Sequence, residues 1–371
     1  MATLIGICLL SSFAVSFSTT AAMRRIGPRL GLIDHPDAKR KVHSAPTPLG
    51  GGVGIWAGIA LPMAAAQAVV WWISSLDSIP GWMPTEITPL LGGISLRARE
   101  VWSIFGAGTV VFLLGLLDDR LTLGWRPKLV VQLIVAGLLV SAGIRATVFA
   151  KAEWIGVVLS VIWFVVLINA FNFLDNMDAL SSGVGLIASA MFTIVMLTGT
   201  AEPRWFVASC LLILCGSLAG FLVHNWPPAR IFMGDSGSCL IGLVLASLTI
   251  VGTFFEYGHS PGKHVLLAPL CILAVPLYDF CSVVVIRLLQ GRSPFHADKQ
   301  HFSHRLVELG LSRSHAVLTV HLVTLTTGMG ALLLYEVKTW SAALLIMGLI
   351  GCELTVIAIL ETAGRRKASG S

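Results

Sequence analysis

Long, unbroken runs of apolar residues occupy most of this 371-residue chain and leave only short polar segments between them. A helix needs about 20 apolar residues to cross the hydrocarbon core of a membrane, and the runs reach that length. Only 12% of the residues are charged, about half the share in soluble domains, so the chain cannot cover a water-facing surface. The runs also lack the alternation of apolar and polar residues that outer-membrane barrels show. The sequence therefore predicts an all-α polytopic membrane protein.

The runs predict about eleven transmembrane helices in a single integral membrane domain, residues 1–371. No Lys or Arg precedes the first run, whereas Arg24 and Arg25 follow it, which is typical of a retained span and not of a secretory signal. The predicted spans are 3–22, 52–73, 101–117, 128–147, 154–172, 179–199, 205–224, 238–255, 264–287, 315–335 and 340–361.

The basic residues divide unevenly between the two sides of this topology. Most of the 25 Lys and Arg residues fall before spans 2, 4, 8 and 10 or in a short basic tail, 362–371. Basic segments stay in the cytoplasm, so we expect the N-terminus outside, the C-terminus in the cytoplasm and the chain in the cell inner (plasma) membrane. The net charge of +6 is modest for this length and indicates orientation, with no nucleic acid among the expected partners.

Most aspartates lie on the predicted cytoplasmic side, which indicates metal or phosphate chemistry rather than a solubilising surface. Asp118 and Asp119 are adjacent, and the repulsion between them favours a bound cation or a raised pKa. A simple helix end in water is the alternative. Asp235 lies between Gly234 and Gly237 in a segment where free amides at a helix start would suit a phosphate.

The segment 169–178 places Asn169, Asn172, Asn176, Asp175 and Asp178 at helical spacings of three and four. So many polar groups at the inner end of a span usually face a cavity. The alternative is helix termination, with Asp178 as the N-cap of the next span.

Histidines and basic residues gather before span 10. His301, His304 and Arg305 favour an anion site, because neither a C-x-x-C pair nor an H-E-x-x-H pattern supports zinc. The basic segment around His43 suits acidic lipid headgroups or a flap over a phosphorylated substrate. Asp279, deep in span 9, is either a functional acid or a buried hydrogen-bonding partner.

All of these clusters fall on one side of the topology. The sequence therefore predicts one cytoplasmic site of carboxylates, amides, basic residues and glycines. Such a site suits Mg²⁺ and a diphosphate, because Mg²⁺ prefers one or two carboxylates together with phosphate oxygens.

Four motifs in this order resemble the polyprenyl-phosphate N-acetylhexosamine-1-phosphate transferase family over residues 24–325. They are LGLLDDRLTLGWRPKLVVQ, NAFNFLDNMDAL, PPARIFMGDSGS and ADKQHFSHRL. The opening GLIDHPDAKRKVHSAPTPLGGG resembles the GlcNAc-1-phosphate branch more than the phospho-MurNAc-pentapeptide translocase branch. The chain departs from the family pattern at Ser303, where the H-x-H-H motif has histidine, and at Asn176 and Ala179, where D-G-x-D-G has glycine.

The resemblance implies transfer of a sugar-1-phosphate, GlcNAc-1-phosphate by preference, from a UDP-N-acetylhexosamine to polyprenyl (undecaprenyl) phosphate. UMP leaves, and the polyprenyl diphosphate-sugar initiates a cell-envelope polysaccharide. By resemblance, Asp235 and Asp175 hold Mg²⁺ (or Mn²⁺), and Asp118, with Asp119 nearby, orients or deprotonates the lipid phosphate. The implied substrate contacts are Lys128, Asn169, Asn172, Asp175, Asp178, Phe232 (stacked on uracil), His301, His304, Arg305 and His43.

Two alternatives stay open at the level of sequence. In the first, the reaction is the same but the donor carries MurNAc-pentapeptide or another N-acetylhexosamine. In the other the chain is a transporter or flippase, although it shows neither an inverted repeat nor a midplane cluster beyond Asp279. Covalent and direct attack are both compatible with the motifs, as is a homodimer.

Overall fold

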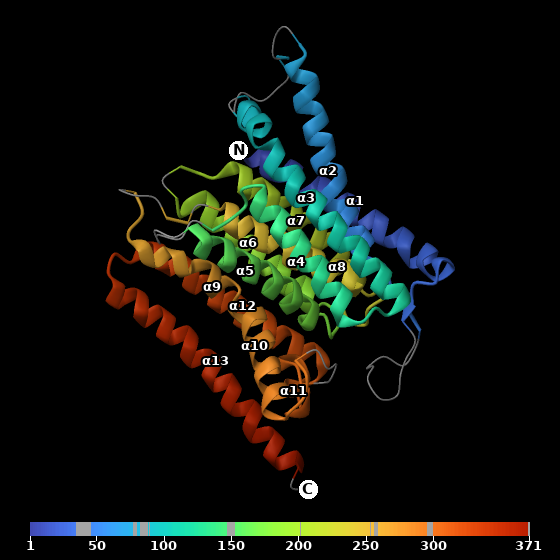
Figure 1. Ribbon diagram of the computed structural model, residues 1–371, viewed down its shortest axis with the longest axis vertical. Helices are drawn as coiled ribbons and strands as arrows, with labels where there is room; N and C mark the ends of the chain where they lie inside the picture. The colour runs from blue at the N-terminus through green and yellow to red at the C-terminus, as the bar shows by residue number, and fades with distance from the viewer. Residues whose placement is uncertain are drawn as a thin grey trace.

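The computed structural model describes the chain apart from residues 35–45, 77–79, 82–87, 89, 147–152, 201, 253, 256–258, 295–299 and 370–371. Within these described ranges the chain is a bundle of helices (Figure 1). The one sheet of the described part joins β1 (Ile33–Asp34) to β2 (Thr47–Pro48) in antiparallel register.

The helices follow the apolar runs, and most predicted bounds are correct within four residues. Their bounds are α1 (Ala2–Ile26), α2 (Gly51–Ser74), α3 (Leu90–Leu121), α4 (Trp125–Ser141), α5 (Glu153–Leu174), α6 (Leu180–Thr198), α7 (Trp205–Asn225), α8 (Gly234–Val251), α9 (Ala268–Ile272), α10 (Ala274–Leu289), α11 (Phe302–Glu308), α12 (Arg313–Glu336) and α13 (Trp340–Ser369), with short 3-10 helices η1 (Gly27–Leu30) and η2 (Lys263–Leu267). The predicted tail 362–371 continues α13 as a helix as far as Ser369.

The structure is that of a polytopic membrane protein, but it does not confirm the number eleven. In the described part, nine helices are long and apolar enough to cross a membrane, or ten if one bent pair is a single span. The predicted span 128–147 corresponds to α4, which has 17 residues and ends at Ser141. At 1.5 Å per residue α4 is about 26 Å long, slightly less than the roughly 30 Å hydrocarbon core.

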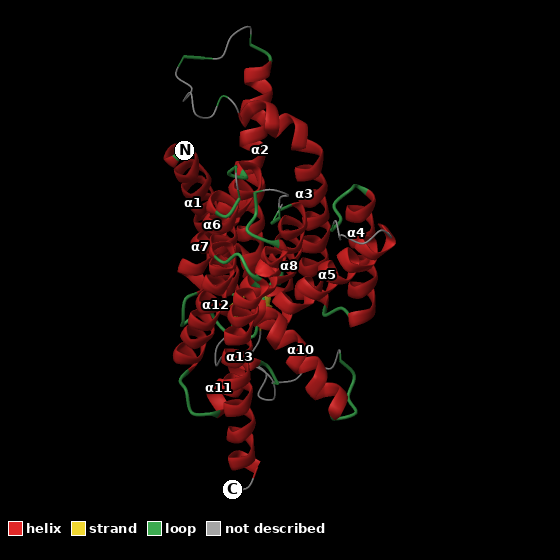
Figure 2. Cartoon of the chain, turned by 90° about the vertical axis from the view of Figure 1, so that its left-hand side faces the viewer, coloured by secondary structure: helices red, strands yellow, loops and turns green. Residues whose placement is uncertain are grey.

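The predicted span 264–287 is broken in the structure. The segment Lys263–Ile272 and helix α10 meet at an angle of 67°. Pro276 lies three residues after the break at Leu273, and its ring and missing N–H prevent the regular helical bond to the carbonyl of Ile272. α10 therefore changes direction, packs on α5 and α12, and points toward the end of the bundle where the C-terminus lies (Figure 2).

Helix α8 is the centre of the bundle and packs against both α3 and α5. Two glycines allow this close approach. A Cβ on Gly115 of α3 would lie 2.4 Å from the amide nitrogen of Ser236, and one on Gly242 of α8 would lie 2.4 Å from the carbonyl oxygen of Leu167. Small residues let membrane helices approach backbone to backbone. The polar ends of α3 and α5 are thereby brought to the start of α8.

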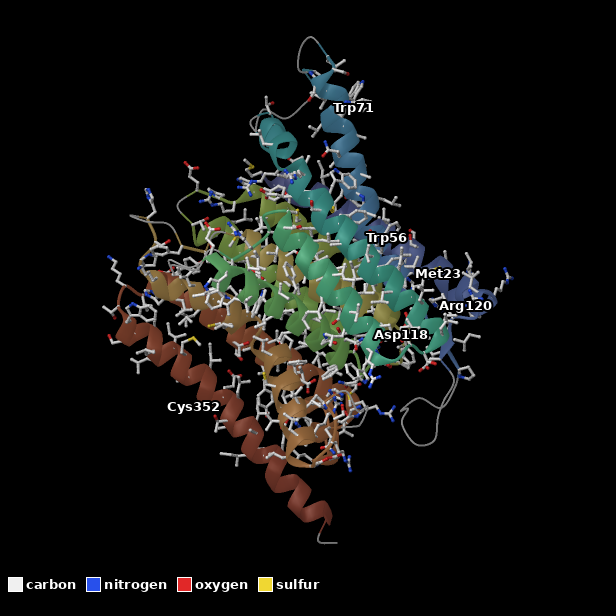
Figure 3. The ribbon with its side chains drawn as sticks, viewed as in Figure 1. Met23, Trp56, Trp71, Asp118, Arg120 and Cys352 are labelled. Carbon is white, nitrogen blue, oxygen red and sulfur yellow. The ribbon has the colours of Figure 1, made fainter. Side chains whose placement is uncertain are left out.

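The polar segments that the sequence places on one side do meet at one end of the bundle. Figure 3 shows Met23, Asp118 and Arg120 together at that end and Trp71 at the opposite end of α2. The backbone N–H of Gly51 donates to the carbonyl of Phe232 at 2.9 Å, which joins the start of α2 to the segment before α8. Trp71 is 78% exposed, as expected of an aromatic residue at a membrane interface.

We expect Gly242→Ala to destabilise the protein by about 1–3 kcal/mol, because the new methyl group would push the α5 backbone away from α8. The melting temperature of the purified protein in detergent measures this. Gly137→Ala in α4 is the matched control, since no atom lies within 4 Å of the Cβ position there. Equal melting temperatures for both variants would contradict the packing described here.

Candidate active site

Lys128 lies between two carboxylates that come from different helices. Its Nζ donates to Asp118 Oδ2 at 2.8 Å and to Asp235 Oδ2 at 2.9 Å. Asp118 is in the last turn of α3, Lys128 is in the first turn of α4 and Asp235 is in the first turn of α8. The structure therefore brings together three residues that the sequence predicts for the site. All three side chains are partly exposed, so a ligand can reach them.

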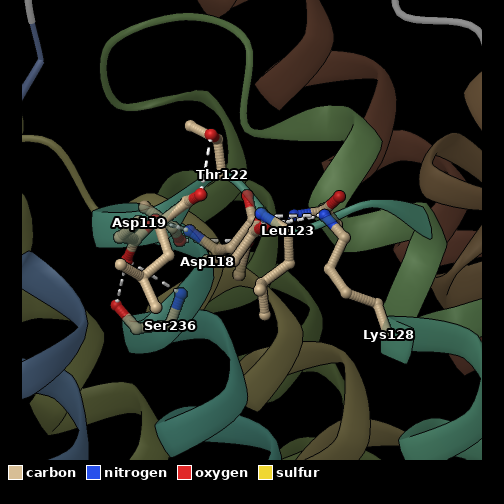
Figure 4. A network of polar contacts seen from close by, with 11 residues as sticks. Asp118, Asp119, Thr122, Leu123, Lys128 and Ser236 are labelled. Carbon is tan, nitrogen blue, oxygen red and sulfur yellow. Dashed lines mark hydrogen bonds and ion pairs between the residues drawn. The ribbon is translucent and has the colours of Figure 1, made fainter. Parts of the chain in front are cut away.

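Asp119 has a different role from its neighbour Asp118. Its Oδ1 accepts the amide of Asp235 at 2.8 Å, and its Oδ2 accepts the hydroxyl of Ser236 at 2.8 Å (Figure 4). The amide of Ser236 also donates to Asp119 Oδ2 at 3.3 Å. Asp119 is therefore the cap of α8. The expectation that these amides are free for a phosphate is wrong, because they already donate to the Asp119 carboxylate.

Gly234 makes this cap possible. Its φ is +74°, a conformation that favours glycine, and a Cβ there would lie 2.4 Å from Asp119 Oδ2. The capped amides also explain why α8 begins at Gly234 rather than at the predicted residue 238: the polar segment Gly234–Ser238 is its first turn.

Asp175 lies in the turn after α5 and faces the other carboxylates. Burial, and then the charges of Asp235, Asp119 and Asp178, raise its pKa well above the usual range. Nearby, Asn172 Nδ2 donates to Ser238 Oγ at 3.2 Å. The turn thus adds a carboxyl group and an amide to the group around Asp235, and the raised pKa of Asp175 reflects burial and a repulsion that Lys128 does not offset.

Asp178 is not the N-cap of α6. Its Oδ2 accepts the amide of Ala229 at 2.9 Å, and α6 has Ala179 at the N-cap position with no side-chain cap. The amide of Ala179 donates instead to Asn225 Oδ1 at 2.8 Å. These bonds fasten the turn 175–179 to the segment before α8. Ala179 itself has a φ of +64°, which agrees with the glycine of the family pattern at this position.

Asn169 and Phe232 each take part in a hydrogen bond between two elements of the site region. Asn169 Nδ2 donates to Oε1 of the buried Gln132 at 2.7 Å, which joins α5 to α4. The backbone N–H of Phe232 donates to the carbonyl of Pro48 at 2.9 Å. Both residues therefore connect elements that surround the site.

His301 is held by Asp279. Its Nδ1 lies 3.0 Å from Asp279 Oδ2, and the amide of Phe302 donates to Asp279 Oδ1 at 2.6 Å. Asp279 is fully buried, so the hydrogen-bonding alternative holds, and the observation that favoured a transporter has another explanation. The His304 ring lies 6.4 Å from the His301 ring, centre to centre, so the two histidines are close together.

Arg305 is not placed with the carboxylates of the site. It is 2% exposed, its Nε lies 2.9 Å from Glu361 Oε2 of α13, and its Nη2 donates to Ser282 Oγ. Tyr278 also donates to Glu361 Oε2, at 3.0 Å. Arg305 thus joins α11 to α10 and α13. The predicted contact at His43 lies outside the described residues, as do His296, Asp298 and Lys299.

Sequence reasoning missed several residues that position the site. Gln132, Asn225 and Glu361 received no role, because a single polar residue within or beside an apolar run has no partner that spacing alone can identify. One signal was present and not used: Ser303 Oγ donates to Asn176 Oδ1, so two of the departures from the family pattern contact each other.

The donor set fits a magnesium ion that shares its coordination with a substrate. Among the described residues, no three His, Cys, Asp or Glu side chains are arranged to hold a metal by themselves. Mg²⁺ does not need such a cage, since it binds one or two carboxylates and takes its other ligands from phosphates and water. The crowded carboxylates Asp235 and Asp175 are suited to that role.

We expect Asp119→Ala to lower stability by about 1–2 kcal/mol, because the first amides of α8 would lose their acceptor. Asp118→Asn is the control, since an amide oxygen can still accept the Leu123 N–H that now bonds Asp118. Thermal unfolding in detergent separates the two variants. A larger loss for Asp118→Asn than for Asp119→Ala would contradict the different roles of these adjacent aspartates.

Comparison with known proteins points to the same family as the four sequence motifs. Residues 101–253, which include most of the site, match the model of glycosyl transferase family 4. The chain is 31% identical to the decaprenyl-phosphate N-acetylglucosaminephosphotransferase of Mycobacterium tuberculosis, over 84% of this chain and 78% of that protein. It is 29% identical to a probable undecaprenyl-phosphate N-acetylglucosaminyl 1-phosphate transferase of Bacillus subtilis, over 91% and 88%. It is 27% identical to the undecaprenyl-phosphate alpha-N-acetylglucosaminyl 1-phosphate transferase of Salmonella typhi, over 87% and 82%.

The family match covers α3 to α8, the helices that carry the carboxylates and Lys128, and the relatives extend the likeness over the histidine segment as well. The resemblance seen in the four motifs is thereby confirmed. The chain belongs to glycosyl transferase family 4, in the branch of the polyprenyl-phosphate N-acetylglucosamine-1-phosphate transferases.

Proposed function

We propose that this chain transfers GlcNAc-1-phosphate from UDP-GlcNAc to polyprenyl phosphate and releases UMP. The observation that carries the proposal is the placement of Lys128 between Asp118 and Asp235 at the end of the bundle where the polar segments meet. The relatives that align with 84–91% of this chain are named for the same reaction, which supports the proposal.

The reaction joins two anions, so charge neutralisation and positioning matter more than a special nucleophile. An oxygen of the lipid phosphate forms a bond to the sugar-linked phosphorus, and the bond from that phosphorus to the bridging oxygen breaks. That oxygen leaves with UMP. Asp118, held by Lys128 and by the amide of Leu123, is placed to orient the lipid phosphate or to accept its proton. Lys128 would then neutralise charge on the diphosphate.

Asp235 and Asp175 are the residues that would hold Mg²⁺. When bound, the ion would neutralise the diphosphate oxygens and stabilise the leaving UMP. Asn172 and Asp178 keep the turn and the start of α8 in place around these carboxylates. Arg305 takes no direct part in this proposal, because it is buried beside Glu361.

His301 and His304 would contact the sugar or nucleotide part of the donor. Asp279 holds Nδ1 of His301, which leaves Nε2 as the nitrogen that can meet a ligand. Phe232 lies on the segment before α8 and would stack on the uracil.

The site would face the cytoplasm, where nucleotide sugars are dissolved, and the polyprenyl tail would stay in the bilayer. This orientation rests on the distribution of basic residues. Eleven crossings, with the N-terminus outside, follow if α4 and the bent pair of helices each cross the membrane once.

Purified protein with UDP-GlcNAc, polyprenyl phosphate and Mg²⁺ should release UMP, and EDTA should stop the release. We expect Asp235→Asn to lower the rate at least about 100-fold, because the site would lose a carboxylate that neutralises charge through the ion. Glu153→Gln is the acid-to-amide control, since its ion pair with Arg145 is exposed.

Sealed inverted vesicles should use UDP-GlcNAc added outside, whereas right-side-out vesicles should not. Full activity of Asp235→Asn would refute the metal assignment. Turnover only by right-side-out vesicles would refute the orientation.

A further inference from the structure

The carboxylates and the histidines of the site belong to different groups of helices. Asp118, Asp175 and Asp235 lie on or beside α3, α5 and α8, which pack on one another. His301 and His304 belong to α11 and the residue before it, and α11 packs on α12 and α13. In Figure 1, α10, α11 and α13 lie at the lower edge of the bundle, and α10 packs on α5. A ligand that touches both halves therefore depends on how the two groups are held together.

α10 packs on α5, where the Phe173 ring meets Phe280 and Arg287. Two further contacts join the histidine segment itself to the end of α5. The Ser303 hydroxyl donates to Asn176 Oδ1, and the Phe173 and His301 rings meet edge to face with centres 5.6 Å apart. Asn176 also donates from Nδ2 to the carbonyl of Phe173 at 2.8 Å, so its side chain is fixed at the end of α5. Ser303 is only 1% exposed. The hydrogen bond is thus formed between two oriented groups and is shielded from water on the Ser303 side.

Each partner of this hydrogen bond is fastened to its own half of the site. On one side, Asp178 and Ala179 bind the turn 175–179 to Ala229 and Asn225. On the other side, Asp279 holds the residues directly before Ser303. Loss of the Asn176–Ser303 bond would therefore let the histidine segment shift relative to the turn 175–179, while the packing of α10 on α5 would keep the helices in place.

We propose that Asn176 and Ser303 are positioning residues that set the fit of the nucleotide sugar between the carboxylates and His301 and His304. This proposal rests on the proposed function, because it assumes a UDP-sugar that spans both halves. A ligand held at both ends is sensitive to small changes in spacing. The pair would therefore act on donor affinity and on discrimination between donors, whereas the phosphoryl transfer itself takes place at the carboxylate half.

Ser303→Ala tests the proposal, since it removes one hydroxyl and adds no bulk. We expect the KM and the Kd for UDP-GlcNAc to rise about five- to tenfold, as for the loss of one buried hydrogen bond, with kcat within about twofold of the wild type. The preference for UDP-GlcNAc over its 4-epimer, UDP-N-acetylgalactosamine, should fall by a similar factor. Asn176→Ala should give the same pattern, and the double variant should be no worse than the more impaired single variant.

Two further variants separate positioning from general damage. Ser303→Thr keeps the hydroxyl and should restore KM to within about twofold of the wild type, as the bond can form again. Ser189→Ala is the matched control: Ser189 is buried, and its hydroxyl donates to the Gly185 carbonyl in the same helix, α6. It should leave KM and donor preference unchanged.

Unchanged KM and Kd in Ser303→Ala, or additive effects in the double variant, would overturn the proposal. A lower kcat together with a lower melting temperature, without a change in Kd, would also overturn the proposal, because this pattern indicates a purely structural role. A wild-type protein that releases no UMP would contradict the proposed function instead, and the Kd comparison would still decide the role of the pair.

Discussion

The contact between the Asp119 carboxylate and the first amides of α8 is the interaction on which the site depends. It fixes the end of α3 against the start of α8, and Gly234 and Gly115 leave the space that this requires. The helix N-terminus is the positive end of the helix dipole, so a carboxylate there is stabilised rather than merely tolerated. With α3 and α8 fixed in this way, Asp118 and Asp235 come close enough to share Lys128.

Sharing one cation between two carboxylates has an energetic consequence. Charged groups away from bulk water are costly unless they are paired, and one ammonium cannot fully balance Asp118, Asp235 and the nearby Asp175. A divalent ion would relieve the repulsion among these carboxylates. We therefore expect this group of carboxylates to bind a cation together with a phosphorylated substrate.

The fold was largely predictable from the sequence, because long apolar runs specify membrane helices with little ambiguity. The break between α9 and α10 was not predicted, although Pro276 lies within the apolar run. Hydropathy shows that a segment is apolar, but it does not show whether the helix axis bends. The meeting of the polar segments was predictable from their common side. Their division of roles was not: Asp118 and Asp119 are identical in sequence terms, and only the rotation of α3 determines which carboxylate caps α8. Arg305 was misplaced for a similar reason, because its partner Glu361 is distant in sequence.

We propose that phosphoryl transfer takes place at Asp118, Lys128 and Asp235. Single-turnover transfer of radiolabelled phosphate from UDP-GlcNAc to polyprenyl phosphate, measured for the wild type and for Lys128→Met, tests it most directly. We expect a rate at least about 100-fold lower for Lys128→Met, because the charge that neutralises the diphosphate is lost, with the Kd for UDP-GlcNAc changed much less. A transfer rate within about twofold of the wild type would show that phosphoryl transfer does not depend on Lys128.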